Sequence, residues 1–273
     1  MTELRATAAD GVPLTALDDG SGPVLLLVHG GAERPASWER VTELLAGDFR
    51  VVRFARRIYV PGARVPPHYS VATEAADILA VAERLGGGPL LLCGHSSGAV
   101  AALEAALREP SVCAGLVLYE PPVLAGDLVG AEPARRARRA LEAGDAREAL
   151  RIHLREIAQE TEAVTDGILA RSVPSDAFTA RVAAGLADVD ALDALGVGVE
   201  RYARLGLPVT LVQGDRSPAH LHRRLAALAR VLPRARVVTL AGQGHTAHRT
   251  GPRALASVLR EAARRAFPDA TPR

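Results

Sequence analysis

Short apolar runs recur along the chain, separated by segments in which apolar residues return every three or four positions. The short runs predict β-strands, and the intervening segments predict amphipathic helices. This alternation is typical of an α/β fold, a mostly parallel, doubly wound sheet with helices on both faces. The predicted strands are Leu4–Thr7, Pro13–Asp18, Pro23–Val28, Arg50–Phe54, Pro89–Cys93, Ala114–Tyr119, Pro208–Gln213 and Arg236–Leu240.

The clearest predicted helix covers Val71–Leu85, where apolar residues return with helical spacing along one face. Ser70 is placed to cap its N-terminus, because a serine side chain can accept a hydrogen bond from the first turn. Three consecutive glycines, Gly86–Gly88, end it before the next predicted strand.

The strand pattern disappears between Pro121 and Leu205, where the chain is rich in Ala, Arg and Glu and has helical character. This stretch lies between two predicted core strands. We therefore expect an α/β core formed by residues 1–120 and 206–273, with residues 121–205 as a helical cap over the active site. An arginine-rich run at residues 135–139 is expected to be a solvated helix face.

The strongest chemical signal is Gly94-His95-Ser96-Ser97-Gly98, a G-x-S-x-G sequence between an apolar strand and an alanine-rich helix. A serine hydroxyl becomes a useful nucleophile when it is held exposed beside a base, and a sharp strand-to-helix turn can hold it so. The central serine of the motif, Ser96, is therefore the predicted nucleophile.

Two further motifs lie upstream and downstream of the serine motif. Upstream, His29-Gly30-Gly31 ends an apolar run, with Trp38 after it; downstream, Gly244-His245 lies in a glycine-bounded loop after the last predicted strand. Together with the serine motif, these features resemble the α/β-hydrolase superfamily in identity and chain order. The resemblance covers nearly the whole chain outside the central helical segment.

The resemblance implies that Ser96 is the nucleophile, that His245 is its base, and that the amides of Gly31 and Ser97 form the oxyanion hole. His248 is the alternative base, and we expect it to face solvent on the same loop. We name the sharp strand-to-helix turn that holds Ser96 the elbow. His95 is expected to line this elbow and to transfer no proton.

His29, Trp38 and Tyr119 are candidates for substrate binding, since each belongs to a segment expected to border the site. For His29 there is a second interpretation, in which the ring only forms hydrogen bonds that shape its turn.

The acid that orients the histidine departs from the commonest pattern of the superfamily. After the strand that precedes Gly214, relatives usually carry an aspartate three residues beyond the glycine, but Ser217 occupies that position here. Asp215 is one residue beyond the glycine, where it can simply form the turn. Glu120 ends the strand that follows the nucleophile helix, as a glutamate does in haloalkane dehalogenases. We predict Glu120 as the acid and retain Asp215 as the alternative.

A second departure lies at residues 54–59, where relatives commonly read D-x-R-G-x-G. Ala55 and Ile58 replace the acidic residue and the first glycine of that motif. Because of this change, the substrate of a particular member of the superfamily should not be assigned to this chain.

Composition narrows the functional class further. The chain has 273 residues, a formal net charge of +2 and 48% hydrophobic residues, with no lysine. The balanced charge and dispersed arginines do not indicate a nucleic-acid partner, and no apolar run suggests a membrane span. Cys93 and Cys113 are expected to be buried free thiols, and with no signal pattern the expected location is cytoplasmic.

These features favour a serine hydrolase, with no cofactor or metal, that cleaves an ester, thioester or lactone of a small molecule through an acyl-enzyme on Ser96. Its expected partner is therefore a small-molecule acyl substrate. Two alternatives keep the same fold: a non-hydrolytic natural-product enzyme, such as a cyclase, lyase or isomerase, and a catalytically silent ligand receptor.

Overall fold

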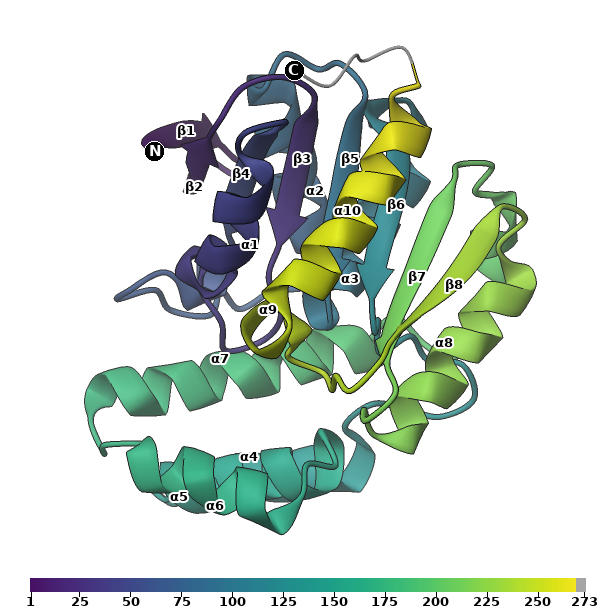
Figure 1. Cartoon of the computed structure of the whole chain (residues 1–273). Helices are drawn as coiled ribbons and strands as arrows, with labels where there is room; N and C mark the ends of the chain where they lie inside the picture. The colour runs from purple at the N-terminus through teal and green to yellow at the C-terminus, as the bar shows by residue number, and fades with distance from the viewer. Residues whose placement is uncertain (269–273) are drawn as a thin grey trace.

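The computed structural model describes residues 1–268, with helices packed on a central sheet (Figure 1). Eight strands form one sheet in the order β1-β2-β4-β3-β5-β6-β7-β8. The pairs β1–β2 and β2–β4 are antiparallel, and the remaining pairs are parallel. The strands are β1 (Thr2–Thr7), β2 (Pro13–Asp19), β3 (Val24–Val28), β4 (Arg50–Ala55), β5 (Leu90–His95), β6 (Cys113–Tyr119), β7 (Val209–Gly214) and β8 (Ala235–Leu240).

Helices cover both faces of the sheet, as the alternating pattern predicts. On one face pack α1 (Glu39–Leu45) and α10 (Pro252–Ala266). On the other face pack α2 (Val71–Arg84), α3 (Ser97–Arg108) and α8 (Ala219–Val231). Successive residues of each central strand alternate between the two cores, which is why these strands are apolar throughout and buried on both sides.

A helical insertion lies between β6 and β7. It contains α4 (Ala131–Glu142), α5 (Ala146–Ile152), α6 (Glu162–Arg171) and α7 (Asp176–Asp193). Figure 1 shows α7 crossing beneath the ends of the central strands, with α4, α5 and α6 stacked on its far side. A separate small core joins α7 to α4 and α5, and α7 also contacts α2 and α3. We name the sheet and the helices that cover its two faces the sheet domain, so α7 is the part of the insertion that packs on the sheet domain.

The carboxyl ends of β3, β4, β5, β6 and β7 face α7, and the segments that leave these ends carry the predicted site residues. In an open α/β sheet this edge is where ligands bind. Cys93 and Cys113 are free and buried, as expected. Within residues 1–268, no helix combines the length and apolar character needed to cross a membrane.

Candidate active site

Ser96 lies at a tight turn between β5 and α3. Its φ and ψ are 52° and −129°, a conformation that L-residues adopt only under constraint from their surroundings. A Cβ at Gly94 would lie 2.4 Å from Ala99 Cα, and a Cβ at Gly98 would lie 2.2 Å from the His29 carbonyl oxygen. Both flanking positions therefore need glycine, and the turn presents Ser96 at the start of α3.

Glu120 and His245 are in direct contact. Glu120 Oε2 lies 2.5 Å from His245 Nδ1, and Glu120 Oε1 accepts a hydrogen bond of 2.7 Å from the amide of Gly214. The glutamate has a φ of 47°, so the chain turns sharply where β6 ends, and its side chain is fully buried. This geometry allows Glu120 to fix the imidazole with a proton on Nδ1 and leaves Nε2 available as a base.

The pKa of Glu120 is below its ordinary value. Burial alone would raise this pKa, but the hydrogen bond and charge of His245, the nearby Ser217 hydroxyl and the Gly214 amide all lower it. The carboxyl group is therefore ionised at neutral pH, the form that can stabilise a protonated His245.

The alternative acid, Asp215, is exposed in the turn after β7 and makes no hydrogen bond with His245 among the described residues. Ser217, at the position where relatives usually have the acid, is buried close to the Glu120 carboxylate. The structure thus brings Glu120 to the histidine and leaves Asp215 at the surface.

The loop that carries His245 is held from beneath by Tyr119 and His95. The Tyr119 hydroxyl donates to the carbonyl of Gly244 and accepts from the amide of Ala247. His95 Nε2 lies 2.8 Å from the backbone carbonyl oxygen of His245. Within residues 1–268 no hydrogen bond joins Ser96 Oγ to His245, and such bonds commonly shorten only when substrate is bound.

The two predicted oxyanion donors, Gly31 and Ser97, lie on neighbouring segments. Gly31 follows β3, and Ser97 is the first residue of α3. Their amides make no hydrogen bond to a protein acceptor within residues 1–268, so both remain free to donate to a ligand. The positive end of the α3 dipole adds to the attraction for a developing negative charge at this point.

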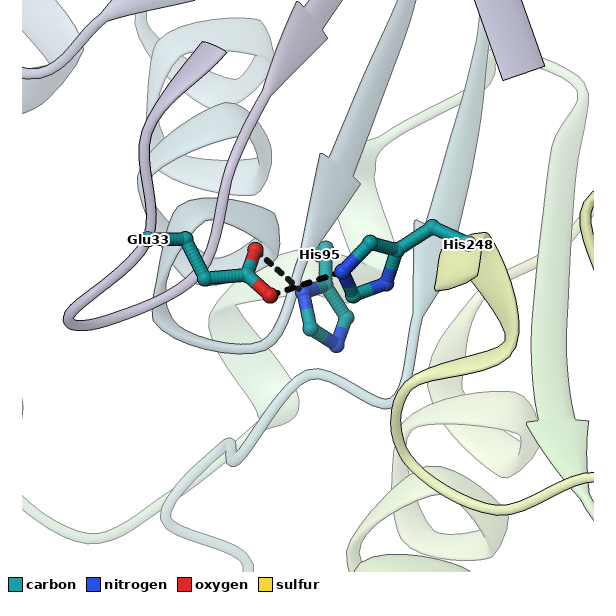
Figure 2. A group of neighbouring side chains, drawn as sticks. All are labelled: Glu33, His95 and His248. Atoms are coloured by element: carbon teal, nitrogen blue, oxygen red, sulfur yellow. Dashed lines mark hydrogen bonds and ion pairs between the residues drawn. The ribbon is translucent and has the colours of Figure 1, made fainter. Parts of the chain in front are cut away.

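A buried cluster of Glu33, His95 and His248, which we name the loop cluster, lies on the His245 side of Ser96. Figure 2 shows both imidazoles turned toward the carboxylate. Glu33 Oε2 lies 3.3 Å from His95 Nδ1, and Glu33 Oε1 lies 2.7 Å from His248 Nε2. The other nitrogen of His95 faces the His245 carbonyl, so this ring joins Glu33 to the His245 loop.

The expectation that His248 faces solvent is wrong. Its side chain is fully buried, and its ring stacks on Trp38 with ring centroids 5.0 Å apart. The short helix α9 (Ala247–Thr250) turns the residue inward, where Glu33 offers a charged partner.

Among the described residues, the loop cluster is also the group whose donor atoms are close enough to share a metal ion, since they all lie within 4.8 Å of one another. In the structure the two imidazoles lie next to each other, and each carboxylate oxygen of Glu33 faces a nitrogen of one of them. Burial would raise the pKa of Glu33, but the charges and hydrogen bonds of the two histidines hold it well below its ordinary range. Each oxygen of the Glu33 carboxylate therefore already faces a histidine nitrogen of the protein.

A second buried cluster lies on the Gly31 side of Ser96. Arg56, which follows β4, donates from Nε to Glu74 at 2.9 Å and from Nη2 to Asp188 at 2.7 Å. Glu74 belongs to α2 and Asp188 to α7, so the arginine joins the sheet domain to the helical insertion. We name Arg56, Glu74 and Asp188 the bridging cluster.

The three predicted substrate-binding residues are all buried, with exposed fractions of 1% for His29, 3% for Trp38 and 1% for Tyr119. His29 Nδ1 lies 2.8 Å from the Gly30 carbonyl, and its Nε2 accepts from the amide of Arg56. Burial and the nearby Arg56 charge lower the His29 pKa to about 4, so this ring is neutral. These contacts are with the protein, and contact with substrate stays a prediction.

Sequence reasoning did not identify either cluster. Arg56 lies inside the segment that departs from the D-x-R-G-x-G pattern, and this was the available signal for it. Asp188 shares a helical stripe with Ala184, Ala191 and Leu192, so an acid on an otherwise apolar face was a signal of a buried partner.

Comparison with known proteins supports the same assignment of family. The sequence profile of the alpha/beta hydrolase family matches residues 25–258. The 2-(acetamidomethylene)succinate hydrolase of Mesorhizobium japonicum is 26% identical over 259 residues, covering 88% of each chain. The uncharacterized hydrolase YraK of Bacillus subtilis is 33% identical over 107 residues, covering 38% of this chain and 40% of that protein.

Among solved structures, an alpha/beta hydrolase from Sphaerobacter thermophilus superimposes with a TM-score of 0.82 at 28% identity, covering 95% of this chain and all of that chain. The match extends over the sheet domain and the helical insertion alike. With this fold, this family profile and the serine, glutamate and histidine at its sheet edge, the chain belongs to the alpha/beta hydrolase family.

Proposed function

We propose that the protein is a serine hydrolase that cleaves an ester, thioester or lactone of a small molecule through an acyl-enzyme on Ser96. The observation that carries this proposal is the 2.5 Å contact between Glu120 and His245, which lies beside a serine at a constrained strand-to-helix turn. A nucleophile, a base and a group that orients the base are the parts that acyl transfer requires.

In the proposed reaction, His245 Nε2 takes the proton of Ser96 Oγ as that oxygen attacks the carbonyl carbon. Glu120 keeps the proton on Nδ1 and stabilises the imidazolium that forms. The amides of Gly31 and Ser97 donate to the oxyanion. His245 then protonates the leaving alcohol or thiol, and a water molecule, deprotonated by the same base, releases the acyl group. These steps use no metal or organic cofactor.

Arg56 is a buried cation on the Gly31 side, and it is already paired with the carboxylates of Glu74 and Asp188. It is therefore not free to bind a substrate carboxylate. The Mesorhizobium japonicum relative is named as a hydrolase of a succinate derivative, and we propose that the two proteins share hydrolysis as their reaction type.

A covalent probe tests the mechanism directly. A serine-directed fluorophosphonate should add one adduct to the wild-type protein, read by intact mass, and should add none to Ser96→Ala. The same variant should lose about 10⁶-fold in turnover of a simple aryl ester, since nucleophile removal in serine hydrolases has this scale of effect.

Ser97→Ala is the matched control, because it removes the neighbouring hydroxyl and keeps the backbone amide. It should still reach one adduct per chain after long incubation. Turnover of the aryl ester by Ser96→Ala at the wild-type rate would reject the serine mechanism. A wild-type protein that neither labels nor turns over ester would favour a non-hydrolytic activity or a ligand receptor.

A further inference from the structure

Asp188 connects the helical insertion to the two residues proposed as oxyanion donors. Its Oδ2 accepts a hydrogen bond of 2.7 Å from Ser97 Oγ. A Cβ built on Gly31 would lie 3.3 Å from the same oxygen, so the carboxylate is in close contact with that glycine as well. Asp188 is only 3% exposed. A side chain of α7 therefore lies against both residues proposed to form the oxyanion hole.

Hydrogen bonds fix this carboxylate from several directions. Arg56 donates from Nη1 to Oδ2 at 3.0 Å and from Nη2 to Oδ1 at 2.7 Å, a two-point contact that sets the plane of the carboxylate. Tyr59 donates to Oδ2 at 2.9 Å, and Tyr69 lies 3.3 Å from Oδ1. Arg56 Nη1 also lies 2.9 Å from Ser97 Oγ, so the serine hydroxyl is held by both charged groups.

An isolated carboxylate at this place would oppose catalysis, because a fixed negative charge raises the energy of a nearby oxyanion. The guanidinium of Arg56 supplies a positive charge at hydrogen-bond distance from Asp188, although it also pairs with Glu74. Because burial and the charge of Asp188 raise the pKa of Glu74, Asp188 is the carboxylate that this charge mainly offsets, and the electrostatic cost of holding Ser97 in place is reduced. The arrangement is complete only when α7 is docked on the sheet domain.

We propose that Asp188 is a positioning residue that makes the oxyanion hole depend on the docked helical insertion, acting through Ser97 Oγ. This inference rests on the proposed serine mechanism. It predicts that the insertion contributes to the rate of acylation even for substrates too small to reach it.

The first test compares two acids of the same helix. Asp188→Asn keeps the size of the side chain but removes the charge and one of the acceptor oxygens. Asp193→Asn is the matched control, because Asp193 also serves the insertion, by accepting hydrogen bonds from the amides of Val129, Gly130 and Ala131, and makes no contact with the elbow among the described residues.

With p-nitrophenyl acetate as substrate, Asp188→Asn should lower kcat by about 10-fold to 10²-fold and change KM by less than roughly threefold, since small misplacements of an oxyanion donor act on the transition state. The rate of fluorophosphonate labelling should fall in proportion. Asp193→Asn should leave both rates within roughly threefold of wild type. Equal effects of the two substitutions would overturn the inference, because they would show general loosening of the insertion.

A double-mutant cycle covers the case in which Asp188→Asn folds poorly. Ser97→Ala removes the hydroxyl through which Asp188 is proposed to act, and it is a small change at a helix start. It should by itself lower kcat, and combining it with Asp188→Asn should cost little more than the larger single effect. Effects that multiply would overturn the inference, as would wild-type kcat in Ser97→Ala.

The two proposals fail in different ways. If the wild-type protein takes no fluorophosphonate and turns over no ester, the serine mechanism is wrong. If the wild-type protein labels at Ser96 and turns over ester while Asp188→Asn matches Asp193→Asn, the mechanism stands and the positioning role of Asp188 is rejected. Circular dichroism and the melting temperature of each variant show whether the comparison is made between folded proteins.

Discussion

The loop cluster and the bridging cluster contact different parts of the proposed site, and both are buried. His95 of the loop cluster contacts the backbone of His245, whereas Asp188 of the bridging cluster contacts Ser97 and Gly31. The loop cluster is drawn from three segments of the sheet domain, since Glu33 follows β3, His95 ends β5 and His248 lies in α9. The bridging cluster takes Asp188 from the helical insertion. The base side of the site is thus assembled within the sheet domain, whereas the oxyanion side is completed by the insertion.

The clusters also differ in their charge balance. In the loop cluster one carboxylate faces two imidazoles, and the pKa of Glu33 is held well below its ordinary range. In the bridging cluster two carboxylates share one arginine. Burial and the charge of Asp188 raise the pKa of Glu74 despite its contact with Arg56, whereas the pKa of Asp188 is lowered, burial notwithstanding, by that arginine.

This difference suggests that the base and the oxyanion hole depend on different parts of the molecule. A base must keep its orientation whether or not substrate is bound, and the loop cluster, with Glu120 and Tyr119, can hold the His245 loop without help from the insertion. An oxyanion hole is needed only when substrate is present, so its donors can depend on contacts with the helical insertion, as proposed for Asp188.

The largest expected effect is on the base side. Glu120→Gln should lower kcat for an aryl ester by about 10⁴-fold, because the amide cannot hold the tautomer or stabilise the imidazolium as a carboxylate does. Asp215→Asn should lower it by less than roughly threefold, since Asp215 is exposed and makes no hydrogen bond to His245 within the described residues. Steady-state kinetics on both purified variants measures the difference.

The reverse outcome, with Asp215→Asn crippled and Glu120→Gln active, would show that the Glu120 contact is only structural. The phosphonate probe separates the attack by Ser96 from later steps of turnover. Loss of the orienting acid in Glu120→Gln should slow labelling of Ser96 while leaving the final adduct at one per chain.

The sheet and the positions of Ser96, Glu120 and His245 could be predicted because their signals are local. Apolar runs fall on the strands, and glycines mark the elbow where the backbone is crowded. The position of Glu120 followed from its place at a strand end and from the serine at 217. In a parallel sheet the ends of neighbouring strands meet at one edge, so placing residues at those ends also places them together.

The clusters could not be predicted because their contacts join distant segments. Arg56 and Asp188 are 132 positions apart, and their meeting depends on how α7 crosses the sheet. His248 was predicted to face solvent as a loop residue, whereas the stacking on Trp38 and the pairing with Glu33 depend on packing that no local pattern describes. Polar residues on apolar faces, such as Asp188, mark where such packing should be sought.

The next largest effect is on stability and concerns the bridging cluster. Arg56→Met should lower the free energy of unfolding by about 3–5 kcal/mol, because it leaves the buried carboxylates of Glu74 and Asp188 without their cation. Arg136→Met is the matched control, since Arg136 pairs with Glu156 on the exposed face of α4 and such pairs contribute less than about 1 kcal/mol. Urea unfolding, followed by circular dichroism, measures both. Similar losses in the two variants would show that charge does not hold the insertion on the sheet domain.

The smallest effect separates the two clusters by the sign of their pH dependence. Glu33 has a lowered pKa, so its contribution to stability is present above its ordinary value of 4.5 and is lost as pH falls through the lower pKa of the folded state. Glu74 has a raised pKa, so the folded state binds its proton first, and the cost of burying its charge disappears as pH falls toward 4.5.

The unfolding free energy of the wild-type protein relative to Glu33→Gln should therefore fall with decreasing pH, and relative to Glu74→Gln it should rise. The opposite signs of the two slopes are the expected result. Urea unfolding of the three proteins between neutral pH and about pH 4 gives both slopes, and slopes of the same sign would mean that the two buried carboxylates are held in equivalent surroundings.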